Sequence, residues 1–204
     1  MLFSAFRKRL AFLAPALLSV SVLIAACGSE PATLVGVERQ PEPVVGNVSL
    51  PLAGSGEDLP FVAPADELLL VYFGFTFCPD ICPTTLADLS FALSELGEGA
   101  ERVEVVMATI DPARDSDEIV TGYVQSFIPE ARAVRTDDQE LLRTATRAFG
   151  ADYSVVRGDD GQPEVGHTTS LYVVDDQGNL VLTWLFGTSG RDIANDLDIL
   201  LDRA

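Results

Sequence analysis

The chain has 204 residues, of which 48% are hydrophobic, and a formal net charge of −18. This is enough apolar material for one domain with a proper core. The acidic surface argues against nucleic acid as a partner, because phosphates bind basic groups, whereas it is compatible with cations and with basic docking patches. We assign no function to the charge itself.

The N-terminal residues have the pattern of a secretory signal. Three consecutive basic residues at 7–9 precede an apolar stretch over 10–26, which is the order of charged and apolar regions in signal peptides. Small residues stand directly before Cys27, as at the site where bacterial lipoproteins are cleaved and lipidated. We therefore expect 1–26 to be a lipoprotein signal peptide and Cys27 to carry lipid. The alternative is an uncleaved membrane anchor with an incidental Cys27.

Both interpretations place the globular part at the extracytoplasmic face of a bacterial membrane, on the periplasmic side or the cell surface. Removal of residues 1–26 takes away three basic groups and no acidic group, so the formal charge falls from −18 to −21. Residues 27–44 are rich in Pro, Gly and Glu and show little periodicity, which predicts a flexible tether. A folded domain is expected over residues 45–204.

The sequence pattern for secondary structure is weak over residues 45–65 and strong over residues 68–96. Residues 45–52 predict a short strand, and residues 53–65 predict a loop with glycine and proline breakers. Residues 68–73 are continuously apolar, as expected for a strand buried on both faces. A helix is predicted from Pro83 or Thr84 to residue 96, since leucines recur there every three or four positions.

The middle of the chain alternates between strands and helices. A second buried strand is expected over 103–110, followed by a helix that Ser116 caps and that ends before Pro129. Residues 131–136 predict a short strand, and residues 139–149 predict another helix.

The C-terminal part predicts a strand over 153–156, a polar loop over 157–166, strands over 169–174 and 180–186 joined by a hairpin turn, and a helix over 191–201. This alternation indicates an α/β fold, with a mixed sheet flanked by helices. A terminal β-hairpin followed by a helix is typical of a thioredoxin-like domain, here with an inserted helix and strand. We find no internal repeats.

Two cysteines four positions apart, Cys78 and Cys82, follow the first buried strand and precede a helix. Backbone N–H groups at a helix N-terminus favour a thiolate, which is both the nucleophile and the metal ligand. On a helix, positions four apart lie on one face, about 5–6 Å from each other. The pair can hold one soft metal ion or close into a disulfide. A purely structural disulfide is the weaker explanation, because such a short loop contributes little stability.

The chain has a single histidine, His167, in the predicted loop before the strand over 169–174. A lone histidine is usually an ordinary polar residue. In a thioredoxin-like domain, however, this loop lies against the cysteine turn, so folding would bring His167 to Cys78 and Cys82. Two thiolates and an imidazole suit Cu(I) or Cu(II) better than hard cations, and a closed structural zinc site would need a fourth ligand.

Three phrases together resemble the Sco/SenC family: F-G-F-T-F-C-P-D-I-C-P-T-T-L at the cysteines, A-T-I-D-P-A-R-D at the end of the second buried strand, and G-H-T-T-S-L-Y-V-V-D at the histidine. The resemblance extends over residues 45–204. It implies a membrane-tethered, thioredoxin-like copper chaperone that helps assemble the binuclear copper site of cytochrome c oxidase. It also implies the copper-site subunit of that oxidase as a partner, together with a thiol reductant or another copper chaperone.

Carried over residue by residue, the resemblance implies that Cys78, Cys82 and His167 bind copper. It further implies that Asp111 is a nearby acidic group that tunes or orients the site. The alternative for Asp111 is a turn residue at the end of a strand, before Pro112.

The sequence departs from the family pattern at two places. Many family members have Asp and Ser on either side of the histidine, where this chain has Gly166 and Thr168. The segment 53–67 is shorter than in the family and shows no clear hairpin before the cysteine strand.

A second function remains open, that of a thiol–disulfide oxidoreductase in which Cys78 and Cys82 are the redox-active pair. This enzyme would reduce the cysteines of a partner's copper site. Thiol exchange does not require His167, whereas a three-ligand copper site does, so this residue discriminates between the two functions.

Overall fold

The computed structural model describes residues 33–158 and 161–204. The expected signal peptide (1–26), the expected lipid site at Cys27 and residues 28–32 lie outside the described residues. Within the described ranges, no helix combines the length and the apolar character that a membrane crossing requires.

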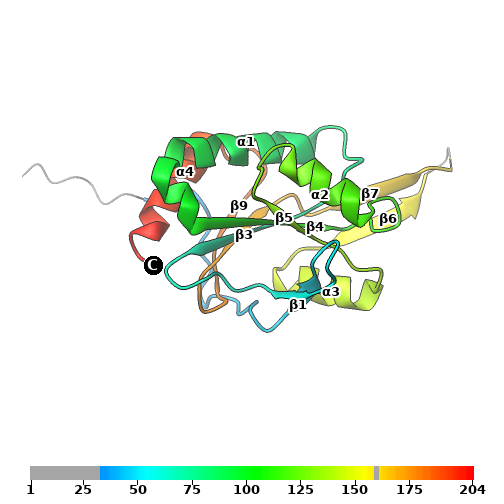
Figure 1. Cartoon of the computed structure of the whole chain (residues 1–204), viewed down its shortest axis with the longest axis horizontal. Coiled ribbons are helices and arrows are strands. Elements are labelled where there is room, and N and C mark those ends of the chain that lie inside the picture. Colours follow the sequence, from blue (N-terminus) through cyan, green and yellow to red (C-terminus); the bar gives the residue numbers. More distant parts are fainter. Residues whose placement is uncertain (1–32, 159–160) are drawn as a thin grey trace, which may run out of the picture. The chain divides into compact units, whose positions relative to one another are not determined.

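A five-stranded mixed sheet forms the centre of the domain, in the order β5-β4-β3-β8-β9 (Figure 1). The central strand β3 runs parallel to β4 and antiparallel to β8, which confirms the predicted mixed sheet. Every residue of β3 is buried, and this explains its uninterrupted apolar sequence. The strands are β3 (Leu68–Gly74), β4 (Val103–Thr109), β5 (Arg132–Val134), β8 (Leu171–Val174) and β9 (Leu180–Trp184).

Helices cover both faces of this sheet. Figure 1 shows α1 and α4 side by side on one face and α3 on the other. The predicted N-cap of α2 is confirmed, because Ser116 accepts a hydrogen bond from a backbone N–H group of the first helical turn. Asp138 caps α3 in the same way. The helices are α1 (Ile81–Leu96), α2 (Asp117–Gln125), α3 (Gln139–Ala148) and α4 (Gly190–Leu201), with a 3₁₀ helix over Gly97–Arg102.

Aromatic side chains fill the core between the sheet and α3. The ring of Phe149 packs edge-to-face against three other rings. Its centroid lies 5.1 Å from that of Phe61, 5.2 Å from that of Phe73 and 5.2 Å from that of Tyr172. Such pairs add to the free energy that burial of the rings already contributes. This cluster fixes β3, and therefore the turn that follows it, against the rest of the domain.

A short hairpin precedes the cysteine strand, where the sequence suggested a loop over 53–65 and no clear hairpin. Strand β1 (Ser49–Pro51) pairs antiparallel with β2 (Asp58–Pro60), and Gly54 and Gly56 adopt positive φ in the connection. Strands of three residues are too short to show a periodic pattern, and the prediction of a loop without a hairpin was therefore wrong.

A second two-stranded hairpin replaces the polar loop predicted over 157–166. Strand β6 (Tyr153–Arg157) pairs antiparallel with β7 (Pro163–His167), and His167 lies opposite Tyr153. Most side chains of the hairpin are exposed or half-buried, so the alternation of apolar and polar residues that marks a half-buried strand is missing. His167 is therefore the last residue of a strand rather than part of a loop.

Part of the segment expected to be a tether contacts the sheet. Val37 exchanges two backbone hydrogen bonds with Thr183 on β9 (2.8 and 3.1 Å). The buried carboxylate of Asp196 on α4 accepts hydrogen bonds from the N–H groups of Val35 (2.9 Å) and Gly36 (2.8 Å) and from Nε1 of Trp184 (2.8 Å). This stretch covers the edge of β9, which would otherwise present unpaired backbone groups.

Candidate metal centre

The cysteine turn connects the end of β3 to the first turn of α1. Both thiols are free; Cys78 is half-buried and Cys82 is completely buried. The backbone N–H of Cys82 donates a hydrogen bond to Sγ of Cys78 over 3.3 Å. This contact ties the two cysteines together at the first turn of α1.

Gly74 lets the chain turn closely beside Tyr72. A Cβ atom at position 74 would lie 2.6 Å from Cε1 of Tyr72 and 3.2 Å from Cε of Met107. Any larger residue would displace the Tyr72 ring. The glycine that ends the buried strand is thus required by packing under the turn.

His167 lies beside the buried cysteine. Its Nε2 atom is 3.9 Å from Sγ of Cys82, and its Nδ1 atom is 2.9 Å from the carbonyl oxygen of Thr168. A carbonyl only accepts, so Nδ1 carries the proton and, in the neutral ring, Nε2 presents a lone pair to the sulfur. Metal-ligating histidines are commonly oriented by a hydrogen bond of this kind.

The surroundings keep this imidazole neutral. Its ring packs edge-on against the rings of Phe75 (5.8 Å) and Tyr72 (6.4 Å). Burial lowers the pKa of His167 below its ordinary value, and the hydrogen bond to the Thr168 carbonyl opposes this shift. A neutral imidazole is the form that binds metal.

The spacing between Cys82 and His167 fits two ligands of one metal ion. A sulfur at about 2.3 Å and a nitrogen at about 2.05 Å from a common ion lie roughly 3.6–3.9 Å apart for bond angles of about 110–125°. The observed 3.9 Å separation lies at the upper end of this range. The donor set is soft, which suits copper.

The Cys82 thiol keeps its proton while no metal is bound. Burial raises its pKa to about 12, and the neighbouring Tyr72 hydroxyl opposes this shift only in part. Metal binding must therefore displace a proton from Cys82.

The three predicted ligands contact one another in two pairs, and Cys82 belongs to both pairs. Cys82 contacts Cys78 through its backbone N–H and His167 through its sulfur. Across residues 33–158 and 161–204, no three His, Cys, Asp or Glu side chains are already gathered around one point. The half-buried side chain of Cys78 must therefore move for all three to bind one ion.

Asp111 lies at the end of β4, as the sequence indicated. Its buried carboxylate forms an ion pair with Arg114, and its backbone N–H donates to Oγ1 of Thr109 over 3.1 Å. The guanidinium of Arg114 in turn lies 4.9 Å from the ring centroid of Phe77, next to Cys78. The predicted influence of Asp111 on the metal ligands stays a prediction.

Asp115 is a positioning residue that the sequence reasoning missed. Its carboxylate is fully buried and accepts hydrogen bonds from the N–H (3.1 Å) and Oγ1 (2.5 Å) of Thr76 and from Oγ1 of Thr109 (2.6 Å). It thereby joins the cysteine turn to the end of β4. The only signal for it was its place as the second acid of the phrase D-P-A-R-D.

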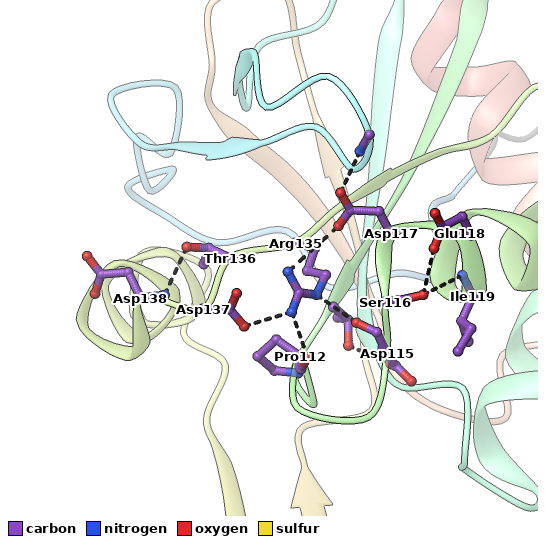
Figure 2. Close-up of polar contacts among 12 residues, drawn as sticks. Pro112, Asp115, Ser116, Asp117, Glu118, Ile119, Arg135, Thr136, Asp137 and Asp138 are labelled. Carbon is purple, nitrogen blue, oxygen red and sulfur yellow. Dashed lines mark hydrogen bonds and ion pairs between the residues drawn. The ribbon is translucent and has the colours of Figure 1, made fainter.

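Arg135 holds the loop that carries Asp115, as Figure 2 shows. Its Nε donates to the carbonyl oxygen of Asp115 over 2.7 Å, and its Nη2 donates to that of Pro112 over 2.9 Å. Asp137 and Asp117 pair with the same guanidinium at 2.7 and 3.7 Å. A rigid planar donor group is suited to such multiple contacts.

Comparisons with known proteins find a matching family model and similar sequences. A family model described as SCO1/SenC matches residues 55–202. An SCO2-like protein of Rickettsia felis is 32% identical over 129 residues, which are 62% of this chain and 62% of that protein. A putative copper-binding protein of Stutzerimonas stutzeri is 33% identical over 112 residues, or 54% of each chain. The chain thus spans less than two thirds of the length of these relatives.

Solved structures share the fold. The solution structure of apo Sco1 from Thermus thermophilus is 31% identical with a TM-score of 0.71, covering 83% of this chain and 98% of that one. Bradyrhizobium japonicum ScoI with copper bound is 26% identical with a TM-score of 0.64, covering 74% and 96%. These two similar structures confirm the thioredoxin-like fold that the sequence predicts.

Proposed function

The chain belongs to the SCO1/SenC family, and from this membership and the site geometry we propose that it is a copper chaperone for the binuclear copper site of cytochrome c oxidase. Copper is the cargo, and Cys78, Cys82 and His167 bind it. The ion supplies a soft centre that prefers thiolate and imidazole ligands.

One observation carries the proposal. Nε2 of His167 is 3.9 Å from Sγ of Cys82, and the hydrogen bond of Nδ1 to Thr168 leaves Nε2 as the acceptor nitrogen. A histidine with a merely structural role would not need its lone pair directed at a buried sulfur. The chain contains no other histidine.

The two cysteines have different parts in this function. Cys82 is buried and beside His167, so it retains the ion. Cys78 is half-buried and therefore the ligand that a partner's donor group can replace first. Transfer then proceeds by exchange of ligands with the copper-site subunit of the oxidase.

The chaperone acts from the extracytoplasmic face of a bacterial membrane. This part of the proposal is supported by the sequence pattern of residues 1–26 and by Cys27, which would be lipidated. A thiol reductant or another copper chaperone would prepare the site, because copper binding requires both thiols to be reduced.

The decisive experiment is a titration of the reduced protein with Cu(I) and Cu(II). We expect one ion per chain, and a loss of affinity of more than about tenfold in His167→Ala, since even a residue that only orients a ligand costs about 10–100-fold. The matched control is Glu164→Ala, an exposed change on the same strand β7, which should bind as the wild type does. Unchanged affinity and absorption in His167→Ala would rule out the three-ligand site.

A second candidate function is supported by the Cys82 N–H that points at Sγ of Cys78. In this thiol–disulfide exchange, the Cys78 thiolate attacks a partner disulfide and releases one partner thiol. Cys82 then attacks Cys78, releases the second thiol and leaves a Cys78–Cys82 disulfide, so the partner gains two electrons and two protons overall. A Cys78→Ser protein that still reduces an oxidised partner would exclude this mechanism.

A further inference from the structure

Arg114 lies against two aromatic rings of the cysteine turn. Its guanidinium carbon is 4.9 Å from the ring centroid of Phe77 and 5.9 Å from that of Phe75. A guanidinium within about 6 Å of a ring centroid attracts the ring electrostatically. One side chain from the loop after β4 thus holds two residues of the turn that follows β3.

The two rings adjoin different ligands of the candidate metal centre. Phe77 directly precedes Cys78 in the chain. Phe75 is buried, and its ring packs edge-on against the imidazole of His167, with 5.8 Å between the ring centroids. Arg114 therefore contacts both the neighbour of the half-buried thiol and the ring that supports the imidazole.

Core packing does not explain the position of Phe77, because this residue is 57% exposed. The guanidinium that stacks on it is itself restrained, since Arg114 forms an ion pair with the buried carboxylate of Asp111. The backbone N–H groups of Arg114 and Asp115 also donate to the carbonyl oxygen of Asp111, over 3.1 and 3.0 Å. A cation that is fixed in this way can restrain an exposed ring without burying it.

The order of the backbone at Cys78 depends on such a restraint. Its N–H donates to the carbonyl oxygen of Phe75 over 3.4 Å, which is longer than an ordinary hydrogen bond between backbone groups. A weakly held residue loses backbone entropy when its side chain binds a metal ion. This cost is smaller if a neighbour such as Phe77 already holds the backbone.

We propose that Arg114 is a positioning residue for copper binding, because its stack on Phe77 and Phe75 holds the backbone of the cysteine turn in place before the ion arrives. Only the side chain of Cys78 then has to rotate toward the ion. The stack thus lowers the entropy cost of binding. The inference rests on the proposed function for its effect on copper, whereas the order of the turn is measured without metal.

The alternative is that Arg114 serves only as the ion-pair partner of Asp111, and lysine distinguishes the two roles. Lysine carries the same charge and can pair with Asp111, but it lacks the planar group that stacks on aromatic rings. Arg114→Lys therefore removes the stack from one side, and Phe77→Leu removes it from the other. Phe77→Tyr keeps an aromatic ring and tests for rescue.

Two quantities are measured for each variant. Hydrogen exchange followed by NMR gives the protection of the amides of residues 76–78 in the reduced, metal-free protein, and anaerobic competition with a chelator gives the Cu(I) affinity. We expect Arg114→Lys and Phe77→Leu each to speed this exchange and to weaken Cu(I) binding by about 2–5-fold, as for the loss of one exposed cation–π contact. The double variant should be no worse than the weaker-binding single variant, because both changes delete the same contact. Phe77→Tyr should behave as the wild type does.

Arg132→Lys is the matched control. Arg132 also forms an ion pair with a carboxylate, that of Glu104 at 2.5 Å. Glu104 lies near the start of β4, whereas the loop that carries Arg114 follows the end of that strand. The same change of arginine to lysine at this distant position should leave the exchange at residues 76–78 and the Cu(I) affinity unchanged.

Three results would overturn the inference alone. Wild-type exchange at residues 76–78 in Arg114→Lys would show that the ion pair with Asp111 is sufficient to order the turn. Faster exchange with wild-type Cu(I) affinity would show that the order of the turn does not affect binding. Effects of the two substitutions that multiply in the double variant would show that Arg114 and Phe77 act separately. Failure of the wild-type protein to bind copper would instead end the proposed function and this inference together, and the wild-type titration alone identifies that case.

Discussion

The Nε2 atom of His167 lies 3.9 Å from Sγ of Cys82, although the two residues are 85 positions apart in the chain. The β6–β7 hairpin supplies the imidazole, and the first turn of α1 supplies the sulfur. Neither element by itself contains a metal site. Their contact, with Nδ1 of His167 held by Thr168, produces a nitrogen and a sulfur that face each other.

The two cysteines should differ in reactivity. We expect iodoacetamide to modify Cys78 more than about tenfold faster than Cys82 in the native reduced protein, because the thiolate is the reactive form. Cys82 is completely buried, and burial raises its pKa to about 12, whereas Cys78 is half-buried. Peptide mapping by mass spectrometry measures both rates. In urea the rates should become similar, and similar rates in the native protein would contradict the prediction.

The stability of the metal-free protein should depend on pH through His167. Burial lowers the pKa of this residue from 6.5, so below that value the unfolded chain binds more protons than the folded one. This contribution to stability is complete above about pH 6.5 and is lost as the pH falls toward the folded-state pKa. Urea unfolding from pH 8 to pH 5 should show the wild type losing stability relative to His167→Gln. The prediction is wrong if the free energy of unfolding of the wild type, minus that of His167→Gln, stays constant or increases as the pH falls.

Removal of the Asp115 carboxylate should destabilise the cysteine turn. Asp115→Ala deletes three hydrogen bonds to Thr76 and Thr109 in a fully buried position. We expect the free energy of unfolding to fall by about 2–4 kcal/mol. Asp137→Ala is the control, because its exposed carboxylate pairs with Arg135 at the surface and its removal should change stability by less than about 1 kcal/mol. If urea unfolding shows that both substitutions lower the free energy of unfolding equally, Asp115 does not anchor the cysteine turn.

The N-terminal stretch should detach from the sheet when Asp196 is replaced. The buried carboxylate accepts hydrogen bonds from Val35, Gly36 and Trp184. Asp196→Ala should therefore increase hydrogen exchange and proteolysis in residues 33–44, and change the emission of Trp184, the single tryptophan. Asp198→Ala, an exposed change on the same helix, is the control and should leave all three unaltered. Wild-type protection in Asp196→Ala would show that other contacts hold the stretch.

The parts of the fold that were predicted correctly have strong local causes. The continuous apolar run of β3 is typical of a strand buried on both faces, and Ser116 marks the start of α2. The hairpins β1–β2 and β6–β7 lack such signals, because their strands are short or largely exposed. Strand pairing in these hairpins depends on tertiary contacts with neighbouring elements, and these contacts cannot be read from the local sequence.

The amino-acid sequence shows which donor groups this protein has: two thiols four positions apart at a predicted helix start, and one imidazole far along the chain. Folding sets two further relations: Nε2 of His167 faces Sγ of Cys82, and Asp115 anchors the cysteine turn. The physical reason is that these relations join residues on separate elements. Their distances are set by packing of the sheet and helices, and no local pattern encodes them.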